Sequence, residues 1–254
     1  MNYIFIQARL GSTRLPGKVL KDMAGKPQLL QMVNRLKNIN LAHRIVVVTS
    51  DLEIDNPIEA FCKEHKLLCG RGSEGDVLDR FYQAAKQLHL TENDIIVRVT
   101  ADCPLHNGEV IDFAIGLFER HQLDYFSNSF APHYEDGCDT EVFRFKTLEI
   151  AAKNAKLLSQ REHVTPYIKD AGIFVCGYKK FHPDFQFKLS VDTPEDHAAV
   201  SGIFQHFAPR TNFSIHEIVE LVKANPALLD SNKDSVINAG YAKSLAEDKE
   251  IGDK

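Results

Sequence analysis

The sequence contains no long apolar run, because none of its apolar stretches approaches the roughly 20 residues that a membrane-spanning helix needs. Its first residues, MNYIFIQAR, lack the basic start and extended apolar middle of a signal peptide. The five cysteines form no C-x-x-C pair, and their odd number argues against a full disulfide framework. We therefore expect a soluble cytoplasmic protein whose cysteines are reduced and structural.

The chain is long enough to bury a sizeable core, with 254 residues of which 44% are apolar. This size predicts one domain over residues 1–254, with or without a small lobe. In the first half, apolar or β-branched runs predict strands at 3–7, 44–50, 67–69 and 94–100. Helical spacing between and after them predicts helices at 27–38, 57–65, 76–88 and 108–121. This order is typical of an α/β fold with a mostly parallel sheet flanked by helices.

The second half is less regular. Strand character occurs at 124–145 and 173–191. Helices are expected at 146–156, 160–170, 194–207 and 214–224. No internal repeat or low-complexity tract divides the chain, and the charged end is expected to form a surface helix.

Positive charge is concentrated near the start of the chain. The first fifty residues hold eight Lys or Arg and a single acid, Asp22, whereas the whole protein has a formal net charge of −5. Proteins that bind nucleic acid over a broad surface usually have a basic domain. This distribution therefore argues against a nucleic-acid partner and favours a pocket for a small polyanion.

A basic loop with two glycines follows the first expected strand, in the stretch ARLGSTRLPGK at residues 8–18. Gly11 allows the backbone to approach a ligand closely, and Ser12 and Thr13 add hydroxyl groups and amides. Three cations of the loop can form charge-assisted bonds with phosphate oxygens: Arg9, Arg14 and Lys18. The spacing is neither that of a Walker A loop nor G-x-G-x-x-G. The alternative is a solvated basic loop.

Two aspartates begin turns after later strands. Asp102 in TADCPL follows the strand at 94–100, and Asp192 in SVDTPED follows a strand that ends near Val191. Ligands of open α/β sheets bind at the carboxyl ends of the strands, so both aspartates should meet the basic loop in one crevice. Mg²⁺ bound with a polyphosphate prefers one or two carboxylates plus phosphate oxygens and water. For Asp192 the alternative is helix capping, which Thr193 could also provide.

Several motifs occur in order along the chain: ARLGSTRLPGKVL with AGKP, RGSEGDVLDRFYQAA, VRVTADCPL, DGCDTEVF, SQREHVTPYI and SVDTPED. Together they resemble the spore-coat polysaccharide cytidylyltransferase family, which is related to the synthetases of CMP-3-deoxy-octulosonate and CMP-sialic acids. The resemblance runs from residue 3 to about residue 200, and continues weakly through NPALLD and NAGYAKSLAED. One departure is Ala101, where relatives commonly have glycine before the aspartate.

The resemblance implies a Rossmann-like, GT-A-like nucleotide-diphospho-sugar transferase fold. It also implies transfer of CMP from CTP to a sugar acid of the nonulosonic or octulosonic type, with release of pyrophosphate. The triphosphate would be held by five residues of the basic loop: Arg9, Ser12, Thr13, Arg14 and Lys18. Arg71 and Arg80 would flank the nucleotide, and Asp102 and Asp192 would hold Mg²⁺. Arg14 and Lys18 would join these aspartates in catalysis.

Other interpretations stay open for single residues. RGSEGDVLDR is also typical of a capped helix with an Asp76–Arg80 ion pair, and both interpretations can hold at once. The irregular part at about 124–190 is where we expect the acceptor, and a helical tail follows from about residue 210. Candidate substrate residues in that part are Asn128, Asp139, Glu141, Arg161 and His163.

These candidates differ in what they offer. Arg161 suits a carboxylate or phosphate by bidentate geometry. His163 is either structural or a base. Asp139 and Glu141 alternate along an expected strand, so both would face one side unless they are merely solvated.

The function also has alternatives. A glycosyltransferase that uses a nucleotide-sugar donor would typically need a D-x-D metal motif, whereas Asp102 and Asp192 lie ninety residues apart. A phosphorylated or phosphonate acceptor is compatible with the same cations. Since relatives are often dimers, a homodimer is one possible assembly.

Overall fold

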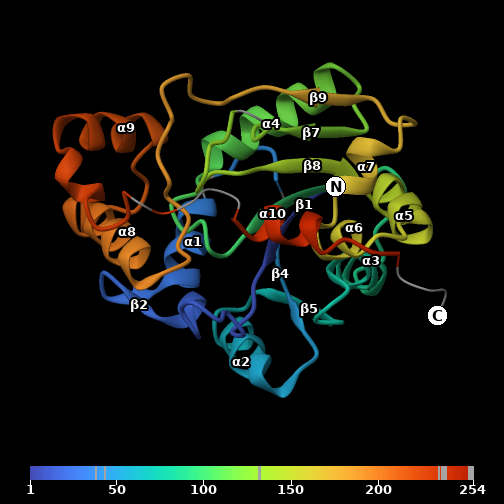
Figure 1. Ribbon diagram of the computed structural model, residues 1–254, viewed down its shortest axis with the longest axis horizontal. Helices are drawn as coiled ribbons and strands as arrows, with labels where there is room; N and C mark the ends of the chain where they lie inside the picture. The colour runs from blue at the N-terminus through green and yellow to red at the C-terminus, as the bar shows by residue number, and fades with distance from the viewer. Residues whose placement is uncertain (38, 43, 131–132, 234, 236–238, 251–254) are drawn as a thin grey trace.

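A computed structural model describes residues 1–37, 39–42, 44–130, 133–233, 235 and 239–250. In this part of the chain one seven-stranded sheet has the order β5-β4-β1-β6-β8-β7-β9 (Figure 1). β1 (Asn2–Gln7) pairs in parallel with both β4 (Arg44–Ser50) and β6 (Ile95–Thr100). β5 (Leu68–Gly72) pairs in parallel with β4 and forms one edge.

The rest of the sheet includes a reversed strand. β8 (Glu141–Arg144) runs antiparallel to both β6 and β7 (Tyr125–Ser127), and β9 (Cys176–Tyr178) pairs in parallel with β7. The expected mostly parallel α/β sheet is therefore confirmed. A small separate hairpin, β2 (Asp22–Met23) with β3 (Lys26–Pro27), follows the basic loop.

Alternation along β1 sends side chains to opposite faces of the sheet, where they form two apolar clusters. Ile4 and Ile6 pack on the face covered by α1 (Gln28–Leu36), α2 (Asn56–Glu64) and α4 (Gly108–Arg120). Tyr3 and Phe5 pack on the face covered by α3 (Val77–Gln87), α5 (Phe145–Asn154) and α7 (Pro166–Asp170). Each face of the sheet is thus shielded from water by amphipathic helices.

A third apolar cluster lies to one side of the sheet, where α8 (Pro194–Phe207) and α9 (Ile215–Ala224) stand apart from α3 and α5 (Figure 1). Leu189 and Val191 are fully buried in this cluster. Their burial fixes the chain just before Asp192, so that this residue emerges at a defined place.

The elements of the first half lie within a few residues of their expected positions, and the strand at 44–50 and the helix at 194–207 have the expected bounds. The expected helix at 160–170 is instead two helices, α6 (Leu158–His163) and α7. Val164 separates them with a φ of 71°, which is unfavourable for a β-branched residue. Of the expected strand at 173–191, only β9 forms.

The C-terminal part contains the 3-10 helix η3 (Pro226–Leu229) and α10 (Ala239–Ala246) after α9. The backbone N–H of Leu158 donates to Lys249 O, so the described end of the chain lies against α6. None of the described helices is long and apolar enough to cross a lipid bilayer.

Candidate active site

Three polar loops meet at the carboxyl ends of β1 and β6. The backbone N–H of Ala8 donates to Val48 O, and that of Ala101 donates to Gln7 O, so the basic loop and the loop of Asp102 start side by side. The backbone N–H of Val191 donates to Asp102 O at 2.7 Å, which brings in the loop of Asp192. This is the edge at which open α/β sheets bind their ligands.

Lys18 lies where the three loops meet. Gly17, with a φ of 71°, adopts the left-handed conformation that favours glycine and turns the chain into the short helix η1 (Lys18–Leu20). The buried Lys18 ammonium group donates to Val191 O at 2.7 Å, and lies 3.0 Å from Asp192 Oδ1 and 3.3 Å from Asp102 Oδ2. Burial by itself would lower the pKa of Lys18, but the two carboxylates outweigh burial and raise it.

The two carboxylates face the same ammonium group from different elements. Burial would raise the pKa of Asp102, but the charge of Lys18 and the hydrogen bonds from Thr100 and Lys18 together outweigh burial, so this pKa lies below its ordinary value. Asp192 precedes α8 without capping it, because the side chain of Thr193 accepts the N–H of Asp196 and forms the cap. Of the two caps that the sequence offered, Thr193 therefore caps α8 and Asp192 does not.

The described residues hold no group of three or more His, Cys, Asp or Glu side chains arranged for a metal ion. Mg²⁺ that is bound largely through phosphate oxygens and water needs only one or two carboxylates. The Lys18 ammonium group lies between Asp102 and Asp192, which shows that the two carboxylates can share one cation. The residues present fit Mg²⁺, and its binding stays a prediction.

The other two cations of the basic loop are half exposed. Arg14 Nη2 lies 3.2 Å from Asp192 Oδ1, with 49% of its side chain exposed. Arg9 Nη1 lies 3.9 Å from Glu74 Oε1 and is exposed to the same extent. Both guanidinium groups are thus held by carboxylates while open to solvent, where a polyanion can reach them.

The small residues of the loop control its shape. Ser12 Oγ accepts the backbone N–H of Leu15 at 3.3 Å, and Thr13 is exposed. A Cβ atom at Gly11 would lie 3.3 Å from Glu74 Oε1. A side chain at position 11 would therefore crowd the gap between the basic loop and Glu74.

The structure places Arg80 beneath the loop after β5. Its Nε donates to Ser73 O and its Nη2 donates to Glu74 O, both at 2.7 Å, and the residue is fully buried. Among the described atoms, its Nη1 has no hydrogen-bond partner. The alternative interpretation of this stretch is confirmed in part: Asp76 caps α3, but it pairs with Arg161 and not with Arg80.

Arg71 is held by the loop after β4 and by α2. Its guanidinium group donates to the backbone carbonyls of Ser50 and Leu52, and to the side chains of Asn56 and Glu59. These bonds tie the end of β5 to α2. The structure does not bring Arg71 together with Lys18 and the two aspartates.

The family model described as cytidylyltransferase matches residues 3–235 of the chain. The chain belongs to the cytidylyltransferase family. Enzymes of this family transfer a cytidylyl group from CTP. The spore coat polysaccharide biosynthesis protein SpsF of Bacillus subtilis (strain 168) is 32% identical to this cytidylyltransferase over 231 residues, covering 87% of this chain and 93% of that protein.

Two further comparisons concern named cytidylyltransferases. A 3-deoxy-manno-octulosonate cytidylyltransferase of Polynucleobacter necessarius is 37% identical over 131 residues, which are 51% of this chain and 50% of that protein. The solved structure of a cytidylyltransferase from Leptospira borgpetersenii superposes with a TM-score of 0.84 at 32% identity, covering 93% of this chain and 99% of that chain. The expected nucleotide-sugar transferase type of fold is therefore confirmed.

In this cytidylyltransferase, the side chain of Asn128 forms hydrogen bonds with the segment that carries Asp139. It is fully buried, and its Nδ2 donates to Glu135 Oε2 at 2.8 Å and to Cys138 O at 2.9 Å. Its Oδ1 accepts the backbone N–H of Thr140 at 2.7 Å. Asn128 thus braces the loop that carries Asp139.

Asp139 and Glu141 have separate surroundings, although the sequence predicts that they face one side. Glu141 is on β8 and contacts Arg98, Tyr125 and Thr165. Asp139 precedes the strand, and burial together with the charge of Asp136 raises its pKa to about 7. The strand is shorter than expected, so its alternation does not extend to Asp139.

Arg161 and His163 contact other helices. Arg161 forms a close ion pair with Asp76 and donates to Ala152 O at 2.7 Å, which holds α6 against α3 and α5. His163 Nε2 lies 2.9 Å from Ser244 Oγ, and burial lowers the pKa of His163. These contacts give both residues a packing role in the described structure.

Three charged residues beside the aspartates were not found from the sequence. Lys188 Nζ lies 3.0 Å from Asp196 Oδ2 and 3.5 Å from Asp192 Oδ2. Asp136 Oδ1 accepts the backbone N–H of Ser190 at 2.9 Å. The available signal was the spacing in KLSVDTPED, which puts a lysine four residues before Asp192 and an acid four residues after it.

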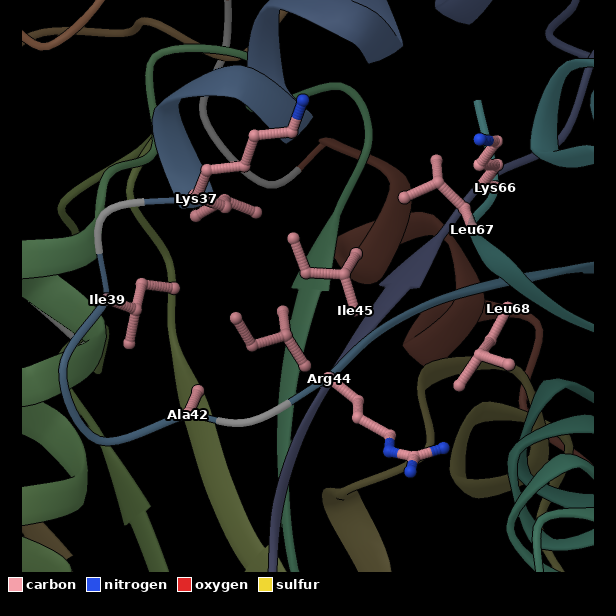
Figure 2. A pocket seen from close by; sticks show the side chains of 10 residues that line it. Lys37, Ile39, Ala42, Arg44, Ile45, Lys66, Leu67 and Leu68 are labelled. Atoms are coloured by element: carbon pink, nitrogen blue, oxygen red, sulfur yellow. The ribbon is translucent and has the colours of Figure 1, made fainter. Parts of the chain in front are cut away.

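A cavity of about 420 Å³ lies away from these residues, at the opposite ends of the strands. Figure 2 shows Ile39, Ala42, Ile45 and Leu68 around it, with Arg44 at the start of β4. Since the three polar loops leave the carboxyl ends of the strands, this cavity is not part of the candidate active site.

Proposed function

We propose that this cytidylyltransferase transfers CMP from CTP to a sugar acid of the nonulosonic or octulosonic type and releases pyrophosphate, in the synthesis of a cell-surface polysaccharide. The names of SpsF and of the octulosonate cytidylyltransferase support the acceptor class and the biological setting. Family membership favours this reaction over the glycosyltransferase alternative. We also propose that the reaction takes place in the cytoplasm.

The observation that carries the proposal is the meeting of Lys18 with Asp102 and Asp192 at the carboxyl ends of the strands. A nucleoside triphosphate needs cations for its phosphate oxygens and carboxylates for its accompanying metal ion. Both kinds of group lie within a few ångströms of one another here. The exposed Arg9 and Arg14 add positive charge at the open side of the loop.

In the proposed reaction the acceptor hydroxyl attacks the α-phosphorus of CTP in line and loses its proton to water, and the bond to pyrophosphate breaks. Little covalent work falls to the protein, so positioning and charge neutralisation provide most of the catalysis. Lys18 and Arg14 would bind the charge that builds on the departing pyrophosphate. Both are paired with Asp192 in the structure, so binding of CTP would exchange a carboxylate partner for phosphate oxygens.

Asp102 and Asp192 are the residues that would hold Mg²⁺. When bound, the ion supplies electrostatic stabilisation to phosphate oxygens. The part of Lys18 is then to keep a positive charge beside the triphosphate at physiological pH, which its raised pKa supports.

The acceptor is tested by incubating the protein with CTP, Mg²⁺ and a panel of acceptors, followed by a pyrophosphate assay. The panel contains nonulosonic acids, octulosonic acids, phosphorylated sugars and phosphonates. Mass spectrometry of the CMP adduct identifies the product. Turnover with a sugar acid is the expected result. Turnover confined to phosphorylated or phosphonate acceptors would contradict the proposed acceptor class while leaving cytidylyl transfer in place.

A further inference from the structure

Asp196 is a fully buried acid at the start of α8 that holds the loop of Asp192. Its Oδ2 accepts the backbone N–H groups of Asp192 and Thr193, both at 3.0 Å. The N–H of Asp196 donates in return to Thr193 Oγ1 at 3.3 Å, which completes a capping box. The backbone of Asp192 is therefore fixed directly by this carboxylate.

The same carboxylate is anchored by the C-terminal part of the chain. Asp196 Oδ1 accepts from Asn232 Nδ2 at 3.2 Å and from Ser235 Oγ at 3.0 Å. Asn232 Nδ2 also donates to Lys188 O at 3.0 Å. Asp196 is thus held on both carboxylate oxygens by described groups.

Lys188 links the Asp196 carboxylate to the active site. Its ammonium group lies 3.0 Å from Asp196 Oδ2 and 3.5 Å from Asp192 Oδ2, and it donates to Ser190 O at 2.9 Å. The Asp192 carboxylate is therefore contacted on Oδ2 by Lys188 and on Oδ1 by Lys18 and Arg14. Contacts on both oxygens determine which way the plane of the carboxylate faces.

We propose that Lys188 and Asp196 are positioning residues for cytidylyl transfer, which hold Asp192 so that its Oδ1 is turned toward Lys18 and the bound nucleotide. The inference rests on the proposed role of Asp192 in the active site. Lys188 attracts Oδ2 of Asp192. Asp196 fixes both the backbone of Asp192 and the ammonium group of Lys188. Neither side chain needs to touch the substrate.

Helix capping alone does not account for this arrangement. The cap of α8 is made by Thr193 and Asp196 without Lys188. A buried ion pair is costly to desolvate, and apolar replacement is often neutral or stabilising. A purely structural pair would thus be replaceable by apolar residues without loss of activity, whereas a positioning pair would not.

The test is a double-mutant cycle of Lys188→Met and Asp192→Asn, measured as kcat, as the KM for CTP, and as the thermal shift produced by CTP with Mg²⁺ in the absence of acceptor. In the wild-type background, Lys188→Met should lower kcat about tenfold, raise the KM for CTP and reduce the thermal shift produced by CTP with Mg²⁺, because the Asp192 carboxylate is no longer held in place. In the Asp192→Asn background the same substitution should change kcat less than about twofold, because the carboxylate that Lys188 positions is already absent. The thermal shift should show the same non-additivity.

Lys153→Met is the matched control, since Lys153 forms an exposed i,i+4 ion pair with Glu149 on α5. It should leave kcat unchanged in both backgrounds. If Lys188→Met does not fold, Asp196→Asn, which retains an acceptor oxygen for the two N–H groups, takes its place in the cycle.

Equal losses in the two backgrounds, or wild-type kcat in a folded Lys188→Met variant, would overturn the inference. The thermal shift needs no acceptor, so it tests the inference even if no sugar acid is turned over. A CTP-induced shift that is unaffected by Asp192→Asn would instead contradict the proposed role of Asp192.

Discussion

Replacing Lys18 with methionine removes the cation between Asp102 and Asp192 while retaining most of the length of the side chain. The ammonium group lies 3.0 Å and 3.3 Å from the two carboxylates. At an effective dielectric constant of about 20, each pair has a gross attraction of about 5 kcal/mol, most of which offsets desolvation. Because the side chains of Asp102 and Asp192 are 31% and 20% exposed, we expect the free energy of unfolding to fall by only about 1–3 kcal/mol.

Mg²⁺ should restore part of this stability in the variant. In Lys18→Met the two carboxylates face each other without their counter-ion, so a divalent cation gains an attractive site that the ammonium group fills in the wild type. Thermal melts with and without Mg²⁺ measure the effect. The melting temperature of Lys18→Met should rise by several degrees with Mg²⁺, and that of the wild type should rise less, since about 1 kcal/mol corresponds to about 2–4 °C for a protein of this size.

Turnover of Lys18→Met should fall about a hundredfold, because a charge-assisted contact to a transition-state oxyanion contributes roughly 3 kcal/mol. Lys153→Met, which removes an exposed lysine on α5, controls for the loss of a charge. Near-wild-type kinetics in a folded Lys18→Met protein would refute the catalytic reasoning. An equal effect of Mg²⁺ on the variant and the wild type would refute the idea that the ammonium group stands where a cation binds.

Further predictions concern the neighbouring groups. Asp102→Asn and Asp192→Asn should each remove most activity and raise the Mg²⁺ requirement, and a double-mutant cycle with Mg²⁺ titration should give non-additive losses; strictly additive losses would separate the two residues. The pKa of Asp139 is raised to about 7, so folding retains a proton that the unfolded chain loses, and stability from this group falls as the pH rises from about 4 to 7. The melting temperature of Asp139→Asn minus that of the wild type should therefore increase as the pH rises from about 4 to 7. A difference that stays constant over this range would contradict the raised pKa of Asp139. Thermal-shift titration should show stronger stabilisation by CTP than by ATP, GTP or UTP, and a preference for a purine would count against the assigned nucleotide.

The first half of the fold was predictable because its signals are local. Each strand there is a short apolar or β-branched run bounded by loops, and each helix has one regularly spaced apolar face. Parallel strands also place their carboxyl ends at a common edge. The meeting of the basic loop with Asp102 therefore follows from the order of the elements along the chain.

The second half was harder because its outcome depends on single backbone conformations and distant partners. The helix expected at 160–170 is interrupted at Val164, whose positive φ no periodicity indicates. Arg161 is suited to a carboxylate, as its residue type suggests, but its partner is Asp76, 85 residues earlier in the chain. A sequence shows which groups an arginine can bind, and only the packing of α6 against α3 decides which one it meets.

Asp192 shows the same limit within the candidate site. The sequence left its carboxylate between a helix cap and a metal ligand, since Asp and Thr are both good caps. The neighbouring residues decide between the two, because Thr193 caps α8 and Asp196 accepts the backbone N–H groups of Asp192 and Thr193. Lys188 then contacts the Asp192 carboxylate on the side away from Lys18. The motifs identify Asp192 as the residue that carries the charge. The orientation of its carboxylate is set by the buried Lys188–Asp196 ion pair. This pair is bonded to Ser235, which lies outside the motifs of residues 3 to about 200. Variants of Lys188 and Asp196 retain the Asp192 carboxylate but change its position. They therefore test whether activity depends on where this carboxylate lies.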